Sequence, residues 1–202
     1  QLKIFQSVSP GTNVRNIGED IVTHQMILTA NHKIRPIDIG ALMAGGLSEI
    51  KVWKKPRVAI IPTGEELVGL DKEEIKAGDI LDFNSRMLST SVIQWGGESV
   101  IYPIIRDIKE DLKETLQLAA EENDIVTVIA GTSAGSKDFT AKALADIGEL
   151  LFHGIAIMPG KPTLAGIIQG APVIGLPGYP VSYLIAAWEF VLPLVYKNLR
   201  QA

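Results

Sequence analysis

From residue 57 onward, short runs of apolar residues alternate with segments in which apolar residues recur at helical spacing. The runs predict strands, and they cover residues 58–62, 99–105, 124–130, 150–157, 163–168 and 172–175. The spaced segments predict helices, and they cover residues 84–95, a stretch opening at 107, 139–147 and 181–199. Asn84 is expected to cap the first of these helices. Strands that alternate with helices predict a mostly parallel sheet with helices on both faces. The expected fold is therefore a three-layer α/β domain over residues 56–202.

The first 55 residues lack this alternation. The turn Ser9-Pro10-Gly11-Thr12-Asn13 is a strong loop signal, and a short helix is predicted over residues 36–43, with Pro36 at its start and Gly45-Gly46 at its end. We expect short strands around them, and hence a small irregular α+β segment over residues 1–55 that is the remnant of a preceding domain. Because Gln1 is not Met and residues 2–9 read like the middle of a strand, we expect the chain to be a fragment.

Composition excludes several classes of function. The 202 residues include no cysteine, which removes disulfides, thiolate nucleophiles and cysteine metal sites, and which fits a cytoplasmic protein. The formal net charge of -4 argues against a nucleic-acid binder. Prolines, glycines and Glu189 interrupt the apolar stretch 173–196, so it predicts a core helix rather than a membrane span, and residues 1–9 do not read as a signal peptide.

Ligands of open α/β sheets bind outside the carboxyl ends of the strands. Five segments follow predicted strands, and they cover residues 63–66, 106–107, 131–138, 158–162 and 176–180. The richest is 131–138, because it holds two glycines and several hydroxyls and leads into a helix N-terminus, a favourable place for phosphate. It matches neither the dinucleotide fingerprint nor the Walker loop. The pattern thus leaves both a phosphate-binding loop and a plain polar connection open.

Charged residues in these segments have two interpretations each. Asp107 and Asp138 offer oxygen ligands that suit Mg²⁺, or each simply caps a helix. Lys161 stands between two prolines, where a rigid turn would hold its charge against an anionic ligand, or it is an exposed loop residue. Three histidines, His24, His32 and His153, are scattered without metal-ligand spacing. Ser133 and Ser136 have no nearby histidine, so hydrolase chemistry is not supported.

Several motifs together resemble one family. They are PGTNVR (10–15) followed by GED (18–20), PRVAIIPTGEEL (56–67), GDI (78–80) with DFNS (82–85), MPGKP (158–162) and GLPGYPVS (175–182). Over nearly the whole chain the sequence is similar to a divergent branch of the MoeA / gephyrin E-domain family, the molybdopterin molybdenumtransferases, whose catalytic domain has a MogA-like fold. The last two motifs are the most specific matches.

The resemblance implies an activity. Family members insert molybdate into molybdopterin, using adenylated molybdopterin as substrate and releasing AMP, with Mg²⁺ assisting. They are usually homodimers whose site is partly built by the partner subunit. The positions that match the family's catalytic residues are Glu66, Asp107, Asp138 and Lys161. Asp107 and Asp138 would hold Mg²⁺, and Glu66 would orient the molybdate or a bound water.

The resemblance also implies a set of ligand-binding positions in the loops. They are Thr63, Gly64, Asn84, Ser85, Gly131, Thr132, Ser133, Gly135, Ser136, Pro162, Pro177 and Gly178. A molybdopterin-type small molecule is the expected partner, with no nucleic acid and no membrane.

Three departures from the family pattern keep alternatives open. The loop from Ala130 reads AGTSAGS instead of SGGVSVG, Met158 replaces a common lysine, and Tyr179 replaces an asparagine. The loss of a lysine removes a positive charge from an anion site. A molybdopterin adenylyltransferase, a CinA-like nucleotide-processing enzyme on the same fold, and a non-catalytic molybdopterin-binding module are the alternatives. Molybdate and tungstate are not distinguished.

Overall fold

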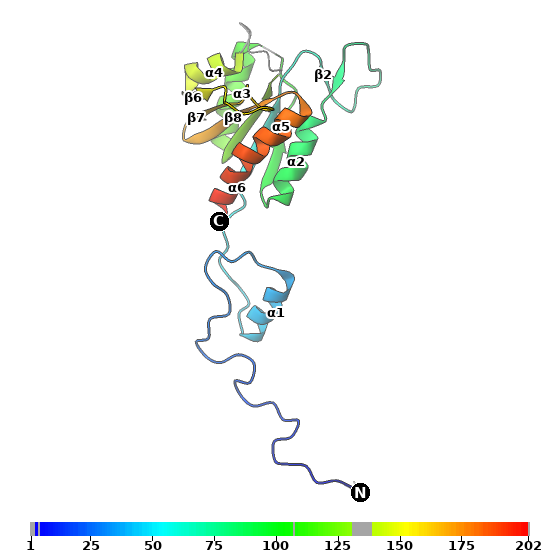
Figure 1. Ribbon diagram of the computed structural model, residues 1–202, viewed down its shortest axis with the longest axis vertical. Coiled ribbons are helices and arrows are strands. Elements are labelled where there is room, and N and C mark those ends of the chain that lie inside the picture. Colours follow the sequence, from blue (N-terminus) through cyan, green and yellow to red (C-terminus); the bar gives the residue numbers. More distant parts are fainter. Residues whose placement is uncertain (1–2, 4, 107, 131–138, 202) are drawn as a thin grey trace. The chain divides into compact units, whose positions relative to one another are not determined.

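The computed structural model describes residues 3, 5–106, 108–130 and 139–201 (Figure 1). The chain divides into two compact units, Gln1–Val52 and Trp53–Ala202. The interpretation of the first unit as the remnant of a preceding domain stays a prediction. No helix in the described part of the chain is long and apolar enough to cross a membrane.

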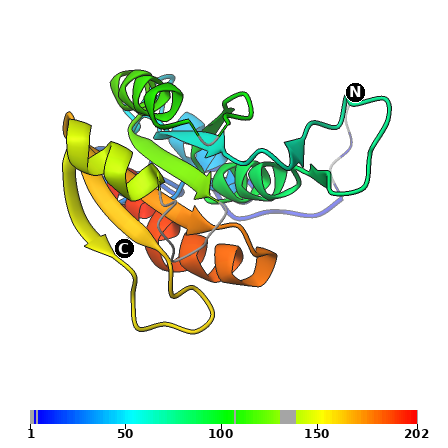
Figure 2. The same cartoon turned by 90° about the horizontal axis from the view of Figure 1, so that it is seen from above.

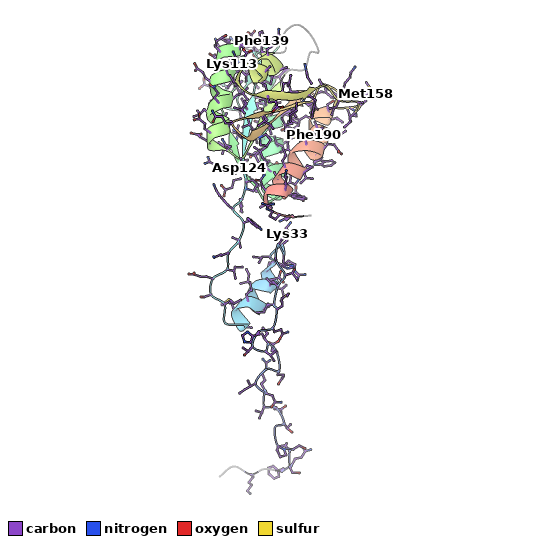
Figure 3. The ribbon with its side chains drawn as sticks, turned by 90° about the vertical axis from the view of Figure 1, so that its left-hand side faces the viewer. Lys33, Lys113, Asp124, Phe139, Met158 and Phe190 are labelled. Atoms are coloured by element: carbon purple, nitrogen blue, oxygen red, sulfur yellow. The ribbon has the colours of Figure 1, made fainter. Side chains whose placement is uncertain are left out.

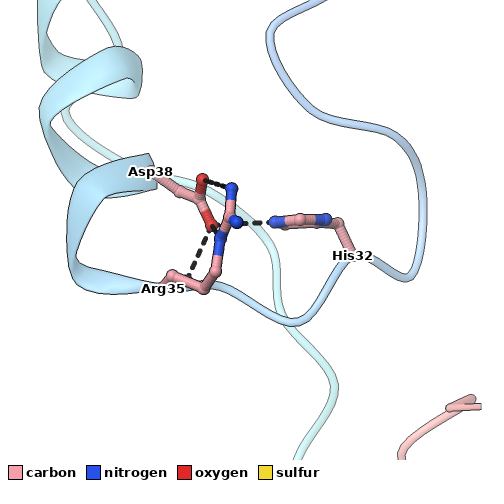
Figure 4. A network of polar contacts seen from close by, with 3 residues as sticks. All are labelled: His32, Arg35 and Asp38. Atoms are coloured by element: carbon pink, nitrogen blue, oxygen red, sulfur yellow. Dashed lines mark hydrogen bonds and ion pairs between the residues drawn. The ribbon is translucent and has the colours of Figure 1, made fainter.

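The first unit contains the expected short helix, α1 (Pro36–Ala44). Its N-terminus is fastened by Asp38, which accepts hydrogen bonds from the Arg35 backbone N–H at 2.8 Å and the Arg35 Nη2 at 2.9 Å, and whose Oδ2 lies 2.8 Å from His32 Nε2 (Figure 4). The hydrogen bonds from Arg35 hold the pKa of Asp38 well below its ordinary value. The short strands predicted here do not form among the residues described, because no extended segment finds a partner for a hydrogen-bonded ladder.

The second unit is built on a six-stranded sheet with the order β4-β1-β5-β8-β7-β6. The strands are β1 (Arg57–Pro62), β4 (Glu98–Ile101), β5 (Ile125–Ala130), β6 (Glu149–His153), β7 (Leu164–Ile168) and β8 (Ala171–Pro177). Strands β4, β1, β5 and β8 pair in parallel, whereas β7 is antiparallel to both of its neighbours. The predicted mostly parallel sheet is confirmed.

Helices cover both faces of this sheet (Figure 2). One face carries α2 (Asn84–Gln94) and a continuous C-terminal helix made of α5 (Pro180–Ala186), the π-helical segment η1 (Ala187–Val191) and α6 (Leu192–Asn198). The other face carries α3 (Lys109–Glu122) and α4 (Phe139–Ile147). Strand residues alternate between the two cores: Val58 and Ile60 face the first, and Ala59 and Ile61 face the second.

Several element boundaries differ from those predicted. The strand expected over 150–157 ends at His153, because Gly154 takes a φ of +88° and turns the chain. The strand expected over 99–105 ends at Ile101 and continues only as an isolated bridge between Ile105 and Thr63. A small parallel pair, β2 (Leu67–Val68) and β3 (Ile80–Leu81), was not predicted, and the segment between them projects from the body of the sheet (Figures 1 and 2).

The parallel strands give the second unit two distinct edges. Their carboxyl ends define the carboxyl edge, which holds the segments after β1 and β8. Their amino ends define the amino edge, which holds Pro56, Asp124 and Ala171. Figure 3 shows Asp124 at the end of this unit opposite to Phe139, the first residue of α4. Since β6 runs in the same direction as β8, the MPGKP turn that follows it also belongs to the carboxyl edge.

Candidate functional site

A cavity of about 350 Å³ opens at the carboxyl edge. Three segments distant in sequence build it: the residues after β1, those leading into α2, and those after β8. The lining residues are Thr63, Glu66, Leu67, Ile80, Leu81, Asp82, Phe83, Asn84, Ile129, Gly178, Tyr179 and Pro180. Of the predicted site residues, the structure therefore brings together Thr63, Glu66, Asn84 and Gly178.

The turn after β1 places the Glu66 carboxylate. Thr63 is buried, and its backbone N–H and its hydroxyl both donate to the Ile129 carbonyl, at 2.9 and 3.1 Å. Gly64 has a φ of +149°, and a Cβ there would stand 3.1 Å from Glu66 Oε2. The missing side chain at Gly64 lets Glu66 fold back over the turn. Thr63 and Gly64 therefore shape the cavity through the backbone.

Asn84 is held by two hydrogen bonds that leave one of its atoms unused. Its Nδ2 donates to the Gly178 carbonyl at 2.8 Å, and its backbone carbonyl accepts from the Tyr183 hydroxyl at 2.7 Å. Among the described residues its Oδ1 has no hydrogen-bond partner, and the residue is only 9% exposed. A buried acceptor without a donor costs about 1–3 kcal/mol. This geometry corrects the prediction that Asn84 caps α2, because Phe83 takes the cap position and the Asn84 side chain crosses to the segment after β8.

Tyr183 holds Asn84 in place through the hydrogen bond from its hydroxyl to the Asn84 backbone carbonyl. It is fully buried in the core between the sheet and α2. Burial, and then the charge of Asp82, raise the pKa of Tyr183 well above its ordinary range. The phenol therefore stays protonated and keeps donating to the Asn84 carbonyl.

Asp82 and Ser85 form a unit at the start of α2. The Ser85 backbone N–H donates to Asp82 Oδ1 at 3.1 Å, and the Ser85 hydroxyl donates to Asp82 Oδ2. Ser85 is fully buried and its hydroxyl is engaged in this contact, so it orients Asp82. Asp82 itself lines the cavity and was not among the predicted site residues. Its place in the DFNS motif, two residues before Asn84, was the signal that could have identified it.

The polar groups of this cavity are mainly hydrogen-bond acceptors. Among the residues that line it, Glu66 and Asp82 supply carboxylates, Asn84 supplies an unused amide oxygen, and none is Lys, Arg or His. The hydroxyl of Thr63 already donates to the backbone. Apolar side chains such as Leu81 form much of the remaining wall. The cavity is therefore suited to a ligand that presents N–H donors together with an apolar surface.

The MPGKP turn, next to this cavity, is stabilised by hydrogen bonds within the turn and its flanking residues. The Ile155 N–H donates to the Lys161 carbonyl at 2.8 Å, and the Thr163 hydroxyl donates to the Gly160 carbonyl at 2.7 Å. A Cβ on Gly160 would lie 3.8 Å from the Ser182 carbonyl oxygen, so the turn packs against the start of α5. Lys161 is exposed. Neither Lys161 nor Pro162 lines the carboxyl-edge cavity, and Pro177 is buried at the end of β8.

The other predicted site residues lie outside the described residues. They are Asp107, Gly131, Thr132, Ser133, Gly135, Ser136 and Asp138. Within the described ranges, no group of three or more His, Asp or Glu side chains could hold a metal ion. The predicted Mg²⁺ ligands and the predicted phosphate loop thus remain predictions.

Comparison with known proteins identifies the family. The sequence pattern of the family described as "Probable molybdopterin binding domain" matches residues 59–197. The chain belongs to this family. A putative molybdopterin biosynthesis protein of Methanocaldococcus jannaschii is 37% identical over 94% of the chain and 49% of its own length. The molybdopterin molybdenumtransferase of Haemophilus influenzae is 31% identical over 93% of the chain and 46% of its own length. The chain spans about half the length of these relatives.

Solved structures agree with this assignment. The MoeA molybdopterin biosynthesis protein from Pyrococcus horikosii superimposes with a TM-score of 0.83 at 38% identity, over 91% of this chain and 46% of that one. The predicted resemblance to MoeA proteins is therefore confirmed, and this chain carries the domain of molybdenum-cofactor biosynthesis proteins. CinA from Thermoplasma acidophilum reaches a TM-score of 0.54 at 14% identity, which shows a shared fold alone.

Proposed function

We propose that this chain is the molybdopterin-binding part of a molybdopterin molybdenumtransferase, which inserts molybdate into adenylated molybdopterin and releases AMP. The observation that carries the proposal is the acceptor-lined cavity at the carboxyl edge, in a chain of this family. The fold alone would not distinguish this reaction from others, because folds host many functions and the chemistry resides in the site.

The cavity supports a particular orientation of the substrate. The pterin ring of molybdopterin is flat and bears an amino group and ring N–H donors. Those donors would be received by the Glu66 and Asp82 carboxylates and by Asn84 Oδ1, which has no other donor among the described residues. Placing phosphate there instead would set two carboxylates against another anion. We therefore assign the cavity to the pterin.

The anionic part of the substrate then belongs outside the cavity. Lys161 offers a cation on a turn that is fastened by its own hydrogen bonds and packed against α5. The segment 131–136 remains the proposed phosphate loop. Both would stabilise the phosphates of adenylated molybdopterin and the incoming molybdate.

This orientation revises the role proposed for Glu66. A carboxylate in a cavity that holds another carboxylate and no cationic side chain repels an oxyanion. Glu66 would therefore accept hydrogen bonds from the pterin or from a bound water, and would not bind molybdate directly.

Mg²⁺ stays in the proposal with Asp107 and Asp138 as the residues that would hold it. When bound, a divalent cation would offset the charge of the phosphates. The described residues supply no complete set of ligands for it, so no step is assigned to it.

A cytoplasmic homodimer is likewise proposed from the family, and light scattering of the purified chain tests it, since a monomer mass would contradict it.

Product analysis tests the proposed reaction. The chain is incubated with adenylated molybdopterin, with and without molybdate, and AMP is quantified by chromatography, beside Lys161→Ala and the exposed control Lys76→Ala. AMP release that requires molybdate and is lowered only by Lys161→Ala is the expected result. In a parallel incubation with molybdopterin and ATP, consumption of ATP with release of pyrophosphate would instead indicate the adenylyltransferase. Saturable binding of adenylated molybdopterin without AMP release would indicate a non-catalytic binding module.

A further inference from the structure

A second cavity, of about 680 Å³, lies at the amino edge of the same sheet. The residues before β1 and β5, the turn between β7 and β8, and the end of α6 build it. Its lining residues are Trp53, Lys54, Lys55, Pro56, Ala120, Asn123, Asp124, Gln169, Gly170, Ala171, Pro172, Leu194, Lys197, Asn198 and Arg200. All of them belong to the second unit. The proposed function uses none of them.

The amino-edge cavity is strongly cationic. It is lined by Lys54, Lys55, Lys197 and Arg200, and within the described part of the chain none of these four forms a salt bridge. The single carboxylate in its lining, Asp124, already accepts the Arg57 backbone N–H at 2.7 Å. The whole chain has a net charge of -4, so four cations around one cavity run against its overall balance. Such a concentration of charge favours an anionic ligand.

Two further features distinguish this cavity from a plain basic surface. The Arg200 guanidinium lies over the Trp53 ring, 5.4 Å from its centroid, which holds both side chains in place at the rim. Asn123 is only 7% exposed, and its Nδ2 donates to the Tyr102 hydroxyl at 3.1 Å and to the Ala119 carbonyl at 2.9 Å. Its Oδ1 is buried and finds no partner in the part of the chain that the structure describes. A ligand with a hydroxyl or amino group would supply the missing donor.

We propose that the amino-edge cavity binds a phosphorylated small molecule that also carries hydroxyl or amino donors, such as a nucleoside monophosphate. The lysines and Arg200 bind the phosphate, and Asn123 accepts a hydrogen bond from the rest of the ligand. The volume lies within the range of small-molecule sites, roughly 300–1,000 Å³. This site is independent of the proposed transferase activity, since it lies at the opposite edge of the sheet.

Nuclear magnetic resonance of the ¹⁵N-labelled chain tests the proposal, because Trp53 lines this cavity. Its indole N–H signal is assigned with Trp53→Phe, and the chain is titrated with AMP, with inorganic phosphate and with sodium chloride of equal ionic strength. We expect a saturable shift of this signal with AMP, a weaker one with phosphate, and none with chloride. The double variant Lys197→Gln/Arg200→Gln removes two exposed cations and should weaken AMP binding about tenfold. Lys161→Ala, at the other edge, should leave the Trp53 shift unchanged.

Three results would overturn the proposal. The Trp53 signal could stay still with AMP and phosphate, it could shift equally with chloride, or it could shift as strongly in the double variant. A shift produced by a glutamate-rich peptide but not by AMP or phosphate would also overturn it, in favour of an acidic protein partner.

Discussion

The two edges of the sheet carry cavities of opposite character. At the carboxyl edge, Glu66 and Asp82 line a cavity that has no cationic side chain among its described lining residues, whereas four lysine and arginine side chains line the cavity at the amino edge. Yet each edge holds a buried asparagine whose amide N–H₂ is bonded to the backbone and whose Oδ1 has no partner within the described ranges: Asn84 at one edge and Asn123 at the other. One fold therefore offers an unused acceptor in two electrostatic settings. The charge of the surrounding side chains decides whether the ligand that binds beside this acceptor is a neutral ring with N–H donors or an anion.

Removal of the Asn84 amide is expected to have the largest effect, a loss of pterin binding at the carboxyl edge. Asn84→Leu removes one of the three acceptors proposed for the pterin and should weaken binding of pterin by about 30-fold, measured by calorimetry. Asn198→Leu, which removes an exposed amide from the amino-edge cavity, is the matched control and should change pterin binding little. Equal losses of pterin affinity in both variants would contradict the assignment of the pterin to the carboxyl-edge cavity. Lumazine, in which an oxo group replaces the amino group of pterin, should bind the wild-type chain more weakly than pterin.

A pair of glycines tests whether the backbone shapes one edge more than the other. Gly64→Ala at the carboxyl edge meets both an unfavourable φ and the Glu66 carboxylate, and should destabilise the chain by about 2 kcal/mol and displace Glu66. Gly170→Ala, in the turn between β7 and β8, has a φ of +88° but nothing within 4 Å of the new Cβ, and should cost only about 1 kcal/mol. Denaturant unfolding measures both, and pterin binding should suffer only in Gly64→Ala. A loss of pterin binding in both would assign the effect to general strain.

Tyr183→Phe removes the hydrogen bond that holds the Asn84 backbone but leaves the Asn84 side chain that would contact the ligand. The variant loses the donor to the Asn84 carbonyl and should be destabilised by about 1 kcal/mol at neutral pH. Because burial raises the pKa of Tyr183, the folded phenol stays protonated where an unfolded tyrosine, with a pKa of about 10, ionises. The stability that depends on this group is therefore complete below about pH 10 and is lost as the pH rises above it.

Denaturant titrations at about pH 9 and about pH 11 measure this effect of pH. Wild type should lose more stability across the interval than Tyr183→Phe does, and the exposed control Tyr179→Phe should behave like wild type. An equal loss in wild type and Tyr183→Phe would contradict the assignment of a raised pKa to Tyr183.

Salt should produce the smallest difference between the edges. Raising the ionic strength from about 50 to about 200 mM screens exposed charges and should weaken AMP binding at the amino edge about threefold. Pterin binding at the carboxyl edge should change by less than about a factor of 1.5, because it depends on buried hydrogen bonds. Calorimetry with both ligands in both buffers makes the measurement. A pterin affinity that falls as steeply as that of AMP would contradict the contrast.

The sequence predicted the layered fold because its strands and helices differ in periodicity, and that signal is local. It also placed Thr63, Glu66 and Gly178 at one edge, because the carboxyl ends of parallel strands must meet there, whereas Asn84 came only from the resemblance to the family. It could not show that Asn84 bonds to Gly178 rather than capping α2, since the two are joined only by tertiary packing.

The amino-edge cavity was missed for the same reason. Its residues come from four separated segments, and lysines such as Lys54 and Lys197 read as ordinary solvated charges until the fold brings them around one cavity. The unused Oδ1 of Asn123 is also visible only in three dimensions, because its burial and the partners of its Nδ2 come from other parts of the chain or from the helix turn before it.

A crystal structure of the chain with adenylated molybdopterin tests the central claim most directly. The account predicts the pterin in the carboxyl-edge cavity, with one of its N–H donors within hydrogen-bond distance of Asn84 Oδ1 and its phosphates outside, towards Lys161. A structure with the phosphates between Glu66 and Asp82, or with the pterin bound elsewhere on the molecule, would contradict it.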